Sequence, residues 1–316
     1  MRTVTRGFWK ECGALLNLEE RLTIAMAMLL NLLMMLFAGL RLTADIFTIN
    51  LLILAFILIV STAHKHYQVT WLRYFRDWYV LGIIIIIYME NRKLIPLVNP
   101  HDVDSIVILI DRFLFLGHDP TVLLERITFP LLTEVLQIAY ASFYFLPFTL
   151  CLLLYFKRSP LDFHINASTI LMGFYLSYIG YYLLPAIGPR FTLNHLQSFP
   201  LSGVLIFNFL RNSLNIAEGM MRDCCPSGHA LVSLLTILLA RRYHRTFFPA
   251  ATLWGALIIS STVYLRYHYV TDIIAGVILG LIVYAYGPSL SMSLICGRDR
   301  TGMSTLPGKG KRAVSG

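Results

Sequence analysis

Long apolar runs separated by short charged segments make up most of this 316-residue chain. The sequence is 57% hydrophobic and only 14% charged, and its mean hydropathy is +0.68. A soluble domain could not cover so much apolar surface, whereas a helical membrane protein exposes it to lipid. We therefore predict an all-α fold, a polytopic bundle of transmembrane helices.

The apolar runs predict about eight crossings, six of whose helices form the core around the candidate site described below. The runs lie near Leu22–Leu42, Ile46–Thr62, Trp78–Met89, Leu131–Phe156, Ile165–Leu184, Ala230–Arg241, Phe247–Tyr267 and Ile273–Cys296. The third run is the shortest, because its uncharged part falls below the roughly 20 residues that a span needs. To span the membrane it must include Arg73, Arg76 or Glu90 near its ends, where such a side chain reaches the interface or is paired.

The chain divides into five predicted regions. These are an N-terminal cytoplasmic segment (1–21), N-terminal transmembrane helices (22–100), an interfacial amphipathic segment (101–130), a transmembrane core (131–296) and a basic, disordered cytoplasmic tail (297–316). The interfacial segment carries scattered charges among its apolar residues, and Gly117-His118-Asp119-Pro120 breaks it into two helices. The tail has the composition of a segment that binds anionic lipid headgroups.

The net charge of +9 reflects the excess of Lys and Arg that membrane proteins carry in their cytoplasmic loops. Most of the 26 Lys and Arg residues lie on the side that carries both termini, which places the termini in the cytoplasm. The opposite side then faces a periplasm or an organelle lumen, and we expect a bacterial inner membrane. Basic stripes with interleaved aromatics are missing from the sequence, so nucleic acid is not an expected partner.

The segment Pro226-Ser227-Gly228-His229 opens one apolar run. Proline suits the first turn of a helix, and glycine lets a ligand approach the backbone. The free N–H groups at such a helix start favour an anion. The segment therefore indicates a phosphate-binding helix start, although a plain helix start with His229 near the headgroups would have the same sequence.

His268 and Asp272 lie four residues apart, so they share one face of a helix. A carboxylate bonded to one imidazole nitrogen fixes the tautomer and leaves the other nitrogen free to attack. A structural His–Asp pair at the interface is the alternative. The two motifs lie at the ends of consecutive helices, so a short antiparallel hairpin brings both to one membrane face. Together they predict a phosphoryl-transfer site.

Three arginines are candidate phosphate ligands. Arg190 ends the preceding crossing, Arg222 lies just before Cys224-Cys225, and Arg266 is two residues before His268. Arginine in a desolvated site is costly unless it meets an anion, and its planar fork matches phosphate oxygens. Each could instead anchor the chain at the headgroups. The five cysteines have no metal-ligand spacing, and we interpret Cys224 and Cys225 as small residues lining the site entrance.

These residues resemble the motifs of the type 2 phosphatidic acid phosphatase superfamily: Lys-x6-Arg-Pro, Pro-Ser-Gly-His and Ser-Arg-x5-His-x3-Asp. The second motif is complete at Pro226–His229. The third matches at Ser261, His268 and Asp272, but Thr262 replaces its arginine. In place of the first motif, Gly188-Pro189-Arg190 inverts the Arg-Pro order. These departures are similar to the branch that contains inositol phosphorylceramide synthases.

The resemblance implies a mechanism. His268 attacks phosphorus and forms a phosphohistidine, Asp272 orients it, and His229 protonates the leaving oxygen and then activates the acceptor. Ser227, Gly228, Arg190 and Arg266 stabilise the phosphoryl oxygens, with Arg222 as a further candidate. No carboxylate cluster of the kind that holds Mg²⁺ lies near these motifs in the sequence, so no cofactor or metal is expected.

The expected substrate is a lipid phosphate or a polyprenyl diphosphate, and the expected partners are membrane lipids. Hydrolysis is favoured because water needs no acceptor pocket, with transfer of a phospho-headgroup as the alternative. A non-enzymatic lipid or solute carrier is an alternative of another class, for which Glu90 would be the relevant intramembrane charge. The oligomeric state does not follow from the sequence.

Overall fold

The computed structural model describes residues 15–157, 159–218 and 222–296, and the predicted tail at 297–316 lies outside them. The described residues form helices joined by loops, without a β-strand among them. In chain order the helices are α2 (Leu18–Leu33), η1 (Met34–Ala38), α3 (Leu40–Tyr67), α4 (Thr70–Val98), α5 (Asp104–Leu114), α6 (Pro120–Leu123), η2 (Leu124–Ile127), α7 (Pro130–Ala141), α8 (Phe145–Lys157), α9 (Pro160–Leu183), α10 (Pro189–Thr192), η3 (Asn194–Leu196), α11 (Phe207–Glu218), α12 (Gly228–Tyr243), α13 (Phe248–Tyr264) and α14 (Val270–Cys296).

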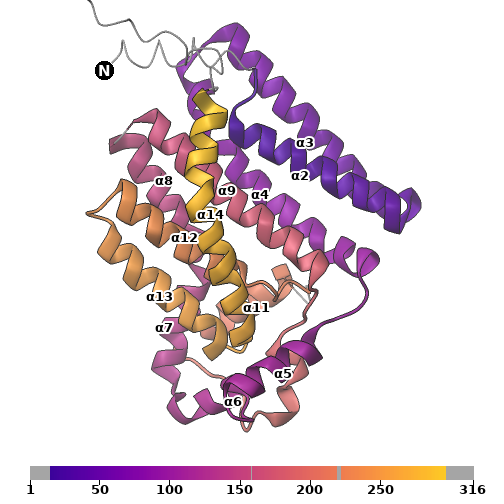
Figure 1. Ribbon diagram of the computed structural model, residues 1–316, viewed down its shortest axis with the longest axis vertical. Helices are drawn as coiled ribbons and strands as arrows, with labels where there is room; N and C mark the ends of the chain where they lie inside the picture. The colour runs from indigo at the N-terminus through magenta and orange to yellow at the C-terminus, as the bar shows by residue number, and fades with distance from the viewer. Residues whose placement is uncertain (1–14, 158, 219–221, 297–316) are drawn as a thin grey trace, which may run out of the picture.

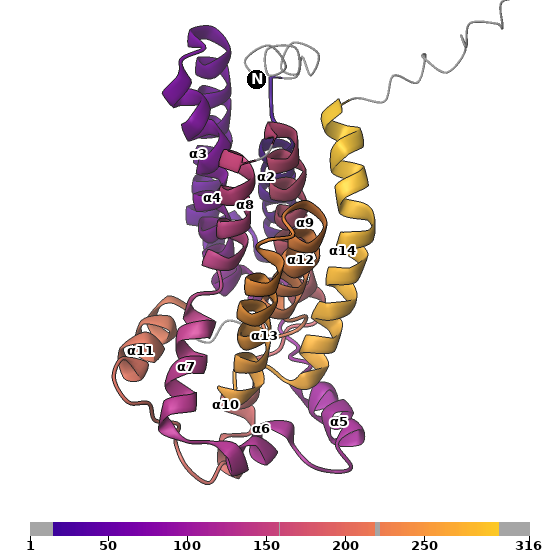
Figure 2. The ribbon, with the colours of Figure 1, turned by 90° about the vertical axis from the view of Figure 1, so that its left-hand side faces the viewer.

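The helices form an elongated bundle (Figure 1). α12 lies at its centre and packs against α9, α13 and α14, while α2, α3 and α4 pack against one another beside α9. The short helices α5, α6 and α10 lie at one end with the loops that carry the motifs (Figure 2). Arg21 at the start of α2 donates to the carbonyl of Leu294 near the end of α14 (3.4 Å), so these two helix ends meet at the opposite end.

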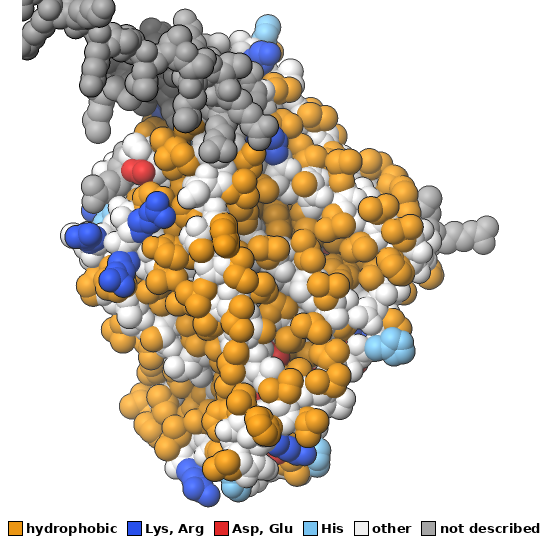
Figure 3. Space-filling model, in the orientation of Figure 1, with side chains coloured by type: hydrophobic (Ala, Val, Ile, Leu, Met, Phe, Trp, Pro, Cys, Tyr) orange, Lys and Arg blue, Asp and Glu red, His pale blue; other side chains and the backbone are white. Residues whose placement is uncertain are grey.

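The predicted all-α membrane bundle is confirmed. Three helices, α2 with η1, α3 and α14, are long and apolar enough to cross a membrane, and α7 with α8 forms a fourth candidate when counted as one bent span. Apolar side chains cover most of the face shown in Figure 3, and its charged side chains gather toward the two ends. The number of crossings, about eight, stays a prediction.

Two predicted runs differ in detail from the helices. Leu131–Phe156 is not one straight helix, because α7 and α8 meet at an angle of 51°. The run Trp78–Met89 lies within the longer α4, which includes Arg73, Arg76 and Glu90 beyond the uncharged run. Arg76 is buried there because its guanidinium forms two hydrogen bonds, of 2.8 and 2.7 Å, with the Glu20 carboxylate of α2. A buried charge paired in this way is tolerated inside a bundle.

The segment 101–130 contains α5, a break, and the short helices α6 and η2. One face of α5 is apolar and exposed, with Leu109 at 68% and Phe113 at 82% exposure. The other face buries Asp104 and Asp111. Amphipathic α5 thus presents apolar side chains outward and two carboxylates inward, and its place in the membrane interface stays a prediction.

Candidate active site

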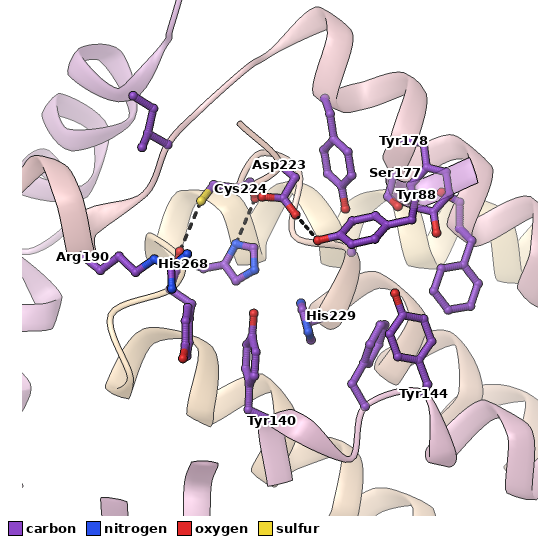
Figure 4. A pocket seen from close by; sticks show the side chains of 16 residues that line it. Tyr88, Tyr140, Tyr144, Ser177, Tyr178, Arg190, Asp223, Cys224, His229 and His268 are labelled. Atoms are coloured by element: carbon purple, nitrogen blue, oxygen red, sulfur yellow. Dashed lines mark hydrogen bonds between the residues drawn. The ribbon is translucent and has the colours of Figure 1, made fainter. Parts of the chain in front are cut away.

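The imidazoles of His229 and His268 face one another, with ring centres 5.6 Å apart and planes at 61° (Figure 4). His229 lies in the first turn of α12, and His268 lies in the loop between α13 and α14. The antiparallel packing of α12 and α13 brings the two motifs to one end of the bundle. The structure therefore brings together the two histidines that the sequence paired.

The His268 ring is held through its Nδ1 atom. Nδ1 lies 3.0 Å from the backbone carbonyl oxygen of Cys224 and 3.6 Å from the Asp272 carboxylate. A carbonyl oxygen only accepts, so Nδ1 donates to it and Nε2 keeps its lone pair. Asp272 is itself fixed, because its Oδ2 atom accepts from the backbone N–H of Tyr269 at 3.0 Å. This arrangement leaves Nε2 available as a nucleophile.

Ser227 is the N-cap of α12. Its hydroxyl accepts from the backbone N–H of Ala230 at 3.3 Å, and its own N–H donates to the carbonyl of Asp272 at 2.9 Å. Ser227 is fully buried and does not line the pocket, whereas Gly228 does. Of these two predicted phosphate ligands, Gly228 therefore lines the pocket, while Ser227 joins the two motifs through the backbone.

A pocket of about 40 Å³ lies between the histidines and the neighbouring helices. One water needs about 10–15 Å³ in the same measure, so the space suits a small polar group. The lining includes six tyrosines, which come from α4, α9 and the region around α7 and α13. The lining residues are Tyr88, Tyr140, Phe143, Tyr144, Phe174, Ser177, Tyr178, Tyr181, Ile187, Arg190, Asp223, Cys224, Gly228, His229, Tyr267 and His268.

Arg190 lines this pocket, and stacked rings connect it to His229. The Arg190 guanidinium lies 4.9 Å from the ring centre of Tyr267. Tyr267 stacks on Tyr140 at 4.3 Å, and Tyr140 stacks on His229 at 4.4 Å. Arg190 also donates to the side-chain carbonyl of Asn215 (2.7 Å). The stack holds a cation and an imidazole on the same pocket wall, which no spacing in the sequence indicates.

Arg266 lies outside the pocket lining, in contrast to the sequence expectation. Its guanidinium pairs with the Glu125 carboxylate at 2.8 Å and donates to the side chain of Gln197 and to the carbonyl of Phe199. The residue is 4% exposed, and its backbone is left-handed with φ of 68°. Arg266 therefore fastens the loop before His268 to the segments around Glu125 and Gln197.

Arg222 also lies outside the pocket lining. Its guanidinium pairs with the Asp102 carboxylate, and both side chains are partly exposed. An arginine already neutralised by a carboxylate has less to gain from a phosphate. Of the three arginines singled out in the sequence, the structure therefore brings Arg190 alone to the histidines.

The amphipathic helix α5 positions two segments of the site, the loop before Arg190 and the start of α14 after His268. Asp104 accepts from the backbone N–H groups of Ile187 and Gly188, each at 2.9 Å, and from the Tyr269 hydroxyl at 2.7 Å. Asp111 accepts from the first N–H groups of α14, at Val270 (3.0 Å) and Thr271 (2.8 Å). Carboxylates in these positions satisfy helix-start donors that would otherwise be unpaired.

Asp223 lines the pocket, although it is not among the site residues predicted from the sequence. The Tyr88 hydroxyl donates to its carboxylate at 2.6 Å (Figure 4). Desolvation in the pocket raises the pKa of Asp223, an effect that this hydrogen bond and His268 oppose in part. The sequence signal for Asp223 is its position directly before Cys224. Its contact with Tyr88 gives no such signal, because the two residues are 135 positions apart in the chain.

Cys224, His268 and Asp272 each offer a ligand atom within 4.8 Å of the others, the one such group among the described residues. Burial raises the pKa of the Cys224 thiol well above its ordinary value, and the thiol donates to the carbonyl of Tyr267 at 3.2 Å. A protonated thiol is a poor metal ligand. The expectation of a metal-independent site stays a prediction.

Comparison with family models places this geometry in a known group. A model of the PAP2 superfamily, whose members are phosphatases and phosphotransferases, matches residues 105–286, more than half of the chain. The matched range includes both histidines, Asp272 and Arg190. Comparison with curated proteins and with solved structures found no match. The motifs, the facing imidazoles and the family model agree, and the chain belongs to the PAP2 superfamily.

Proposed function

We propose that this membrane protein cleaves a phosphate ester or a diphosphate of a lipid through a phosphohistidine on His268. The observation that supports it best is the pair of imidazoles 5.6 Å apart, one of which is held through Nδ1. The space between them is lined by the Arg190 guanidinium and by Gly228 at the start of α12. Such a helix start and a guanidinium stabilise a transferring phosphoryl group.

In the first step, Nε2 of His268 forms a bond to phosphorus as the bond from phosphorus to the lipid oxygen breaks. His229, in its protonated form, gives its proton to that oxygen. In the second step, His229 takes a proton from water, the water oxygen attacks phosphorus, and the bond to His268 breaks. Asp272, 3.6 Å from Nδ1, stabilises the positive ring of the intermediate.

The same proposal includes the topology expected from the charge distribution. Both termini lie in the cytoplasm, and the site opens on the periplasmic or lumenal side of the membrane, with a bacterial inner membrane as the expected location. The start of α2 and the end of α14 meet at one end of the bundle, and the site lies at the other, which supports this orientation.

Transfer of a phospho-headgroup to a lipid alcohol, as in inositol phosphorylceramide synthases, is the second candidate. The Asp223 carboxylate in the pocket favours it, because a carboxylate repels phosphate and binds groups that donate hydrogen bonds. Tyr88 and five further tyrosines add hydroxyl groups around it. A headgroup rich in hydroxyls or carrying an ammonium group would complement these side chains.

The test uses detergent-purified protein, EDTA, and a short-chain lipid phosphate. We expect phosphate release by the wild type, loss of at least about 10³-fold in His268→Ala, and unchanged release in His195→Ala. His195 lies in η3, is exposed and does not line the pocket, so it is the matched control. Undiminished phosphate release by His268→Ala would show that His268 is not the nucleophile.

A second arm separates hydrolysis from transfer. A donor lipid labelled in its headgroup is incubated with the protein and an added lipid alcohol. Label recovered as free phosphate or free headgroup phosphate shows hydrolysis, and label on the alcohol shows transfer. A protein that catalyses neither reaction while remaining folded would favour the carrier alternative.

A further inference from the structure

A second polar cluster lies in the part of the chain that precedes the family match. The helices α2, α3 and α4, on the right in Figure 1, pack against one another and lie before residue 105, where the family match begins. Asn31 of α2, Asn50 of α3, and Glu90 and Asn91 of α4 form the cluster. Among the described residues, Asn50 and Asn91 are fully buried and Glu90 is 5% exposed.

One amide group joins the three helices. Nδ2 of Asn50 donates to Oδ1 of Asn31 and to Oε2 of Glu90, each at 3.1 Å. Two other oxygen atoms, Oδ1 of Asn50 and Oε1 of Glu90, are buried and have no hydrogen-bond partner among the described residues. Because the amide and the carboxylate are already joined on one side, each leaves one acceptor oxygen unused.

The Glu90 carboxylate also lacks a basic partner among the described residues. Lys93, one turn further along α4, pairs with Asp45 of α3 at 2.7 Å, and both are exposed. Arg92 is exposed as well. From α9, the Tyr182 hydroxyl faces Asn91 at 2.7 Å and adds no charge. A carboxylate among apolar helices needs a compensating positive charge, and the neighbouring side chains do not supply one.

The backbone around the cluster is irregular. The π-helix η1 (Met34–Ala38) begins three residues after Asn31, and Thr43 interrupts the start of α3 with φ of −130°. Single π-turns inside helices are frequent at functional sites, because they change the direction in which side chains and carbonyl groups point. This irregularity falls where α2 turns back into α3, between Asn31 and Asn50 in the chain.

We propose that Asn31, Asn50 and Glu90 form a binding site for an exchangeable monovalent cation, a sodium ion or a proton, held between Oε1 of Glu90 and Oδ1 of Asn50. A sodium ion would bridge the two oxygens, while a proton on Oε1 would be donated to Oδ1. A divalent ion is excluded, because one carboxylate and neutral amides leave half of its charge uncompensated among apolar helices.

The site is connected to the catalytic pocket through α4. Tyr88 lines that pocket and contacts Asp223, whereas Glu90, two residues further on, points to the opposite face of the helix. The side chain of Asn91 points in a direction between those of Tyr88 and Glu90, and it accepts a hydrogen bond from the Tyr182 hydroxyl of α9. Cation binding therefore acts on the helix that supplies one wall of the pocket, from a position outside it.

The test measures the thermal stability of the full-length protein in detergent, without substrate. Wild type, Glu90→Gln and Asp45→Asn are unfolded in sodium chloride and in choline chloride at equal ionic strength, over a range of pH. The Asp45→Asn variant removes an exposed carboxylate from the neighbouring helix, so it controls for salt screening. Asn50→Ala is the second site variant, in case Glu90→Gln does not fold.

For a sodium site we expect Tm to rise by at least about 2 °C with saturation in sodium, in wild type and Asp45→Asn but not in Glu90→Gln. Asn50→Ala should require a higher sodium concentration. For a proton site, sodium has no effect, Tm falls more steeply with rising pH in wild type and Asp45→Asn than in Glu90→Gln, and Glu90→Gln loses an infrared band of a protonated carboxyl group. Responses to sodium and pH that are the same in wild type and Glu90→Gln would overturn the proposal, whatever the outcome for phosphate release.

Discussion

Asp272 follows His268 by four residues, yet its carboxylate lies 3.6 Å from Nδ1, farther than the carbonyl oxygen of Cys224 at 3.0 Å. The backbone therefore fixes the tautomer, and the carboxylate contributes charge. The two roles, which the sequence assigned to one residue, are divided between two.

Replacing Asp272 by Asn should test this division. Because the Cys224 carbonyl still holds the ring, we expect the variant to keep its nucleophile in position and to lose about 10²–10³-fold in kcat through missing charge stabilisation. Single-turnover phosphorylation of His268 is the measurement. A rate equal to that of the wild type would show that the carboxylate has no electrostatic role.

Arg190 and Arg266 should differ in what their loss affects. Arg190→Ala removes the guanidinium from the pocket, and we expect kcat/KM to fall about 10²-fold with Tm unchanged. Arg266→Ala removes the guanidinium partner of the Glu125 carboxylate, whose side chain is 9% exposed, which should lower Tm and cost about 1–3 kcal/mol of stability. Steady-state kinetics and thermal unfolding of both variants distinguish the roles, and an exchange of the two effects would contradict the assignment.

The raised pKa of Asp223 predicts a pH-dependent effect on stability. The folded protein holds this proton more tightly than the unfolded chain, whose ordinary pKa is 3.8. The stabilising contribution is therefore complete below that value and is lost as the pH rises through the folded-state pKa. Asp223→Asn, which cannot ionise, should gain in Tm over the wild type as the pH rises above 3.8, and the gain should level off above the folded-state pKa. A difference in Tm that does not change with pH would exclude the raised pKa.

The close contact of α12 and α14 predicts the effect of adding one methyl group. A Cβ atom on Gly276 would lie 2.4 Å from the carbonyl oxygen of Ser227. Gly276→Ala should therefore cost about 1–3 kcal/mol and displace the start of α12, with loss of activity. Gly82→Ala is the control, because nothing lies within 4 Å of its Cβ and alanine favours a helix by about 0.5–1 kcal/mol. Thermal unfolding compares the two, and equal effects would contradict the packing argument.

The sequence was sufficient for the parts of the site that depend on local order. The facing of His229 and His268 followed from two consecutive helices joined by a short turn, because that connection leaves little freedom in the position of their ends. The helix start within Pro226–His229 also followed, although Pro226 precedes the N-cap Ser227 and lies outside the first turn. Both inferences need contacts between neighbouring elements only.

Longer-range contacts decided the rest. Arg266 is near His268 in sequence, but its left-handed backbone and the distant Glu125 place its guanidinium elsewhere. Tyr88 reaches Asp223 across 135 residues. α4 begins at Thr70, before the apolar run, and the charge of its Arg76 is neutralised by Glu20 of α2. Hydropathy treats each residue as if it met lipid alone, so it cannot anticipate a buried pair formed by two segments.

The hydrogen bonds from α5 determine how short a working fragment of this protein can be. A fragment beginning at α7 would keep His229, His268 and Asp272, but it would lack the Asp104 and Asp111 carboxylates that bind Gly188 and the start of α14. Asp104 also lies one residue before the range matched by the family model. Any minimal version built for expression or design therefore has to start upstream of this helix, even though none of its side chains lines the pocket where phosphate is expected to react.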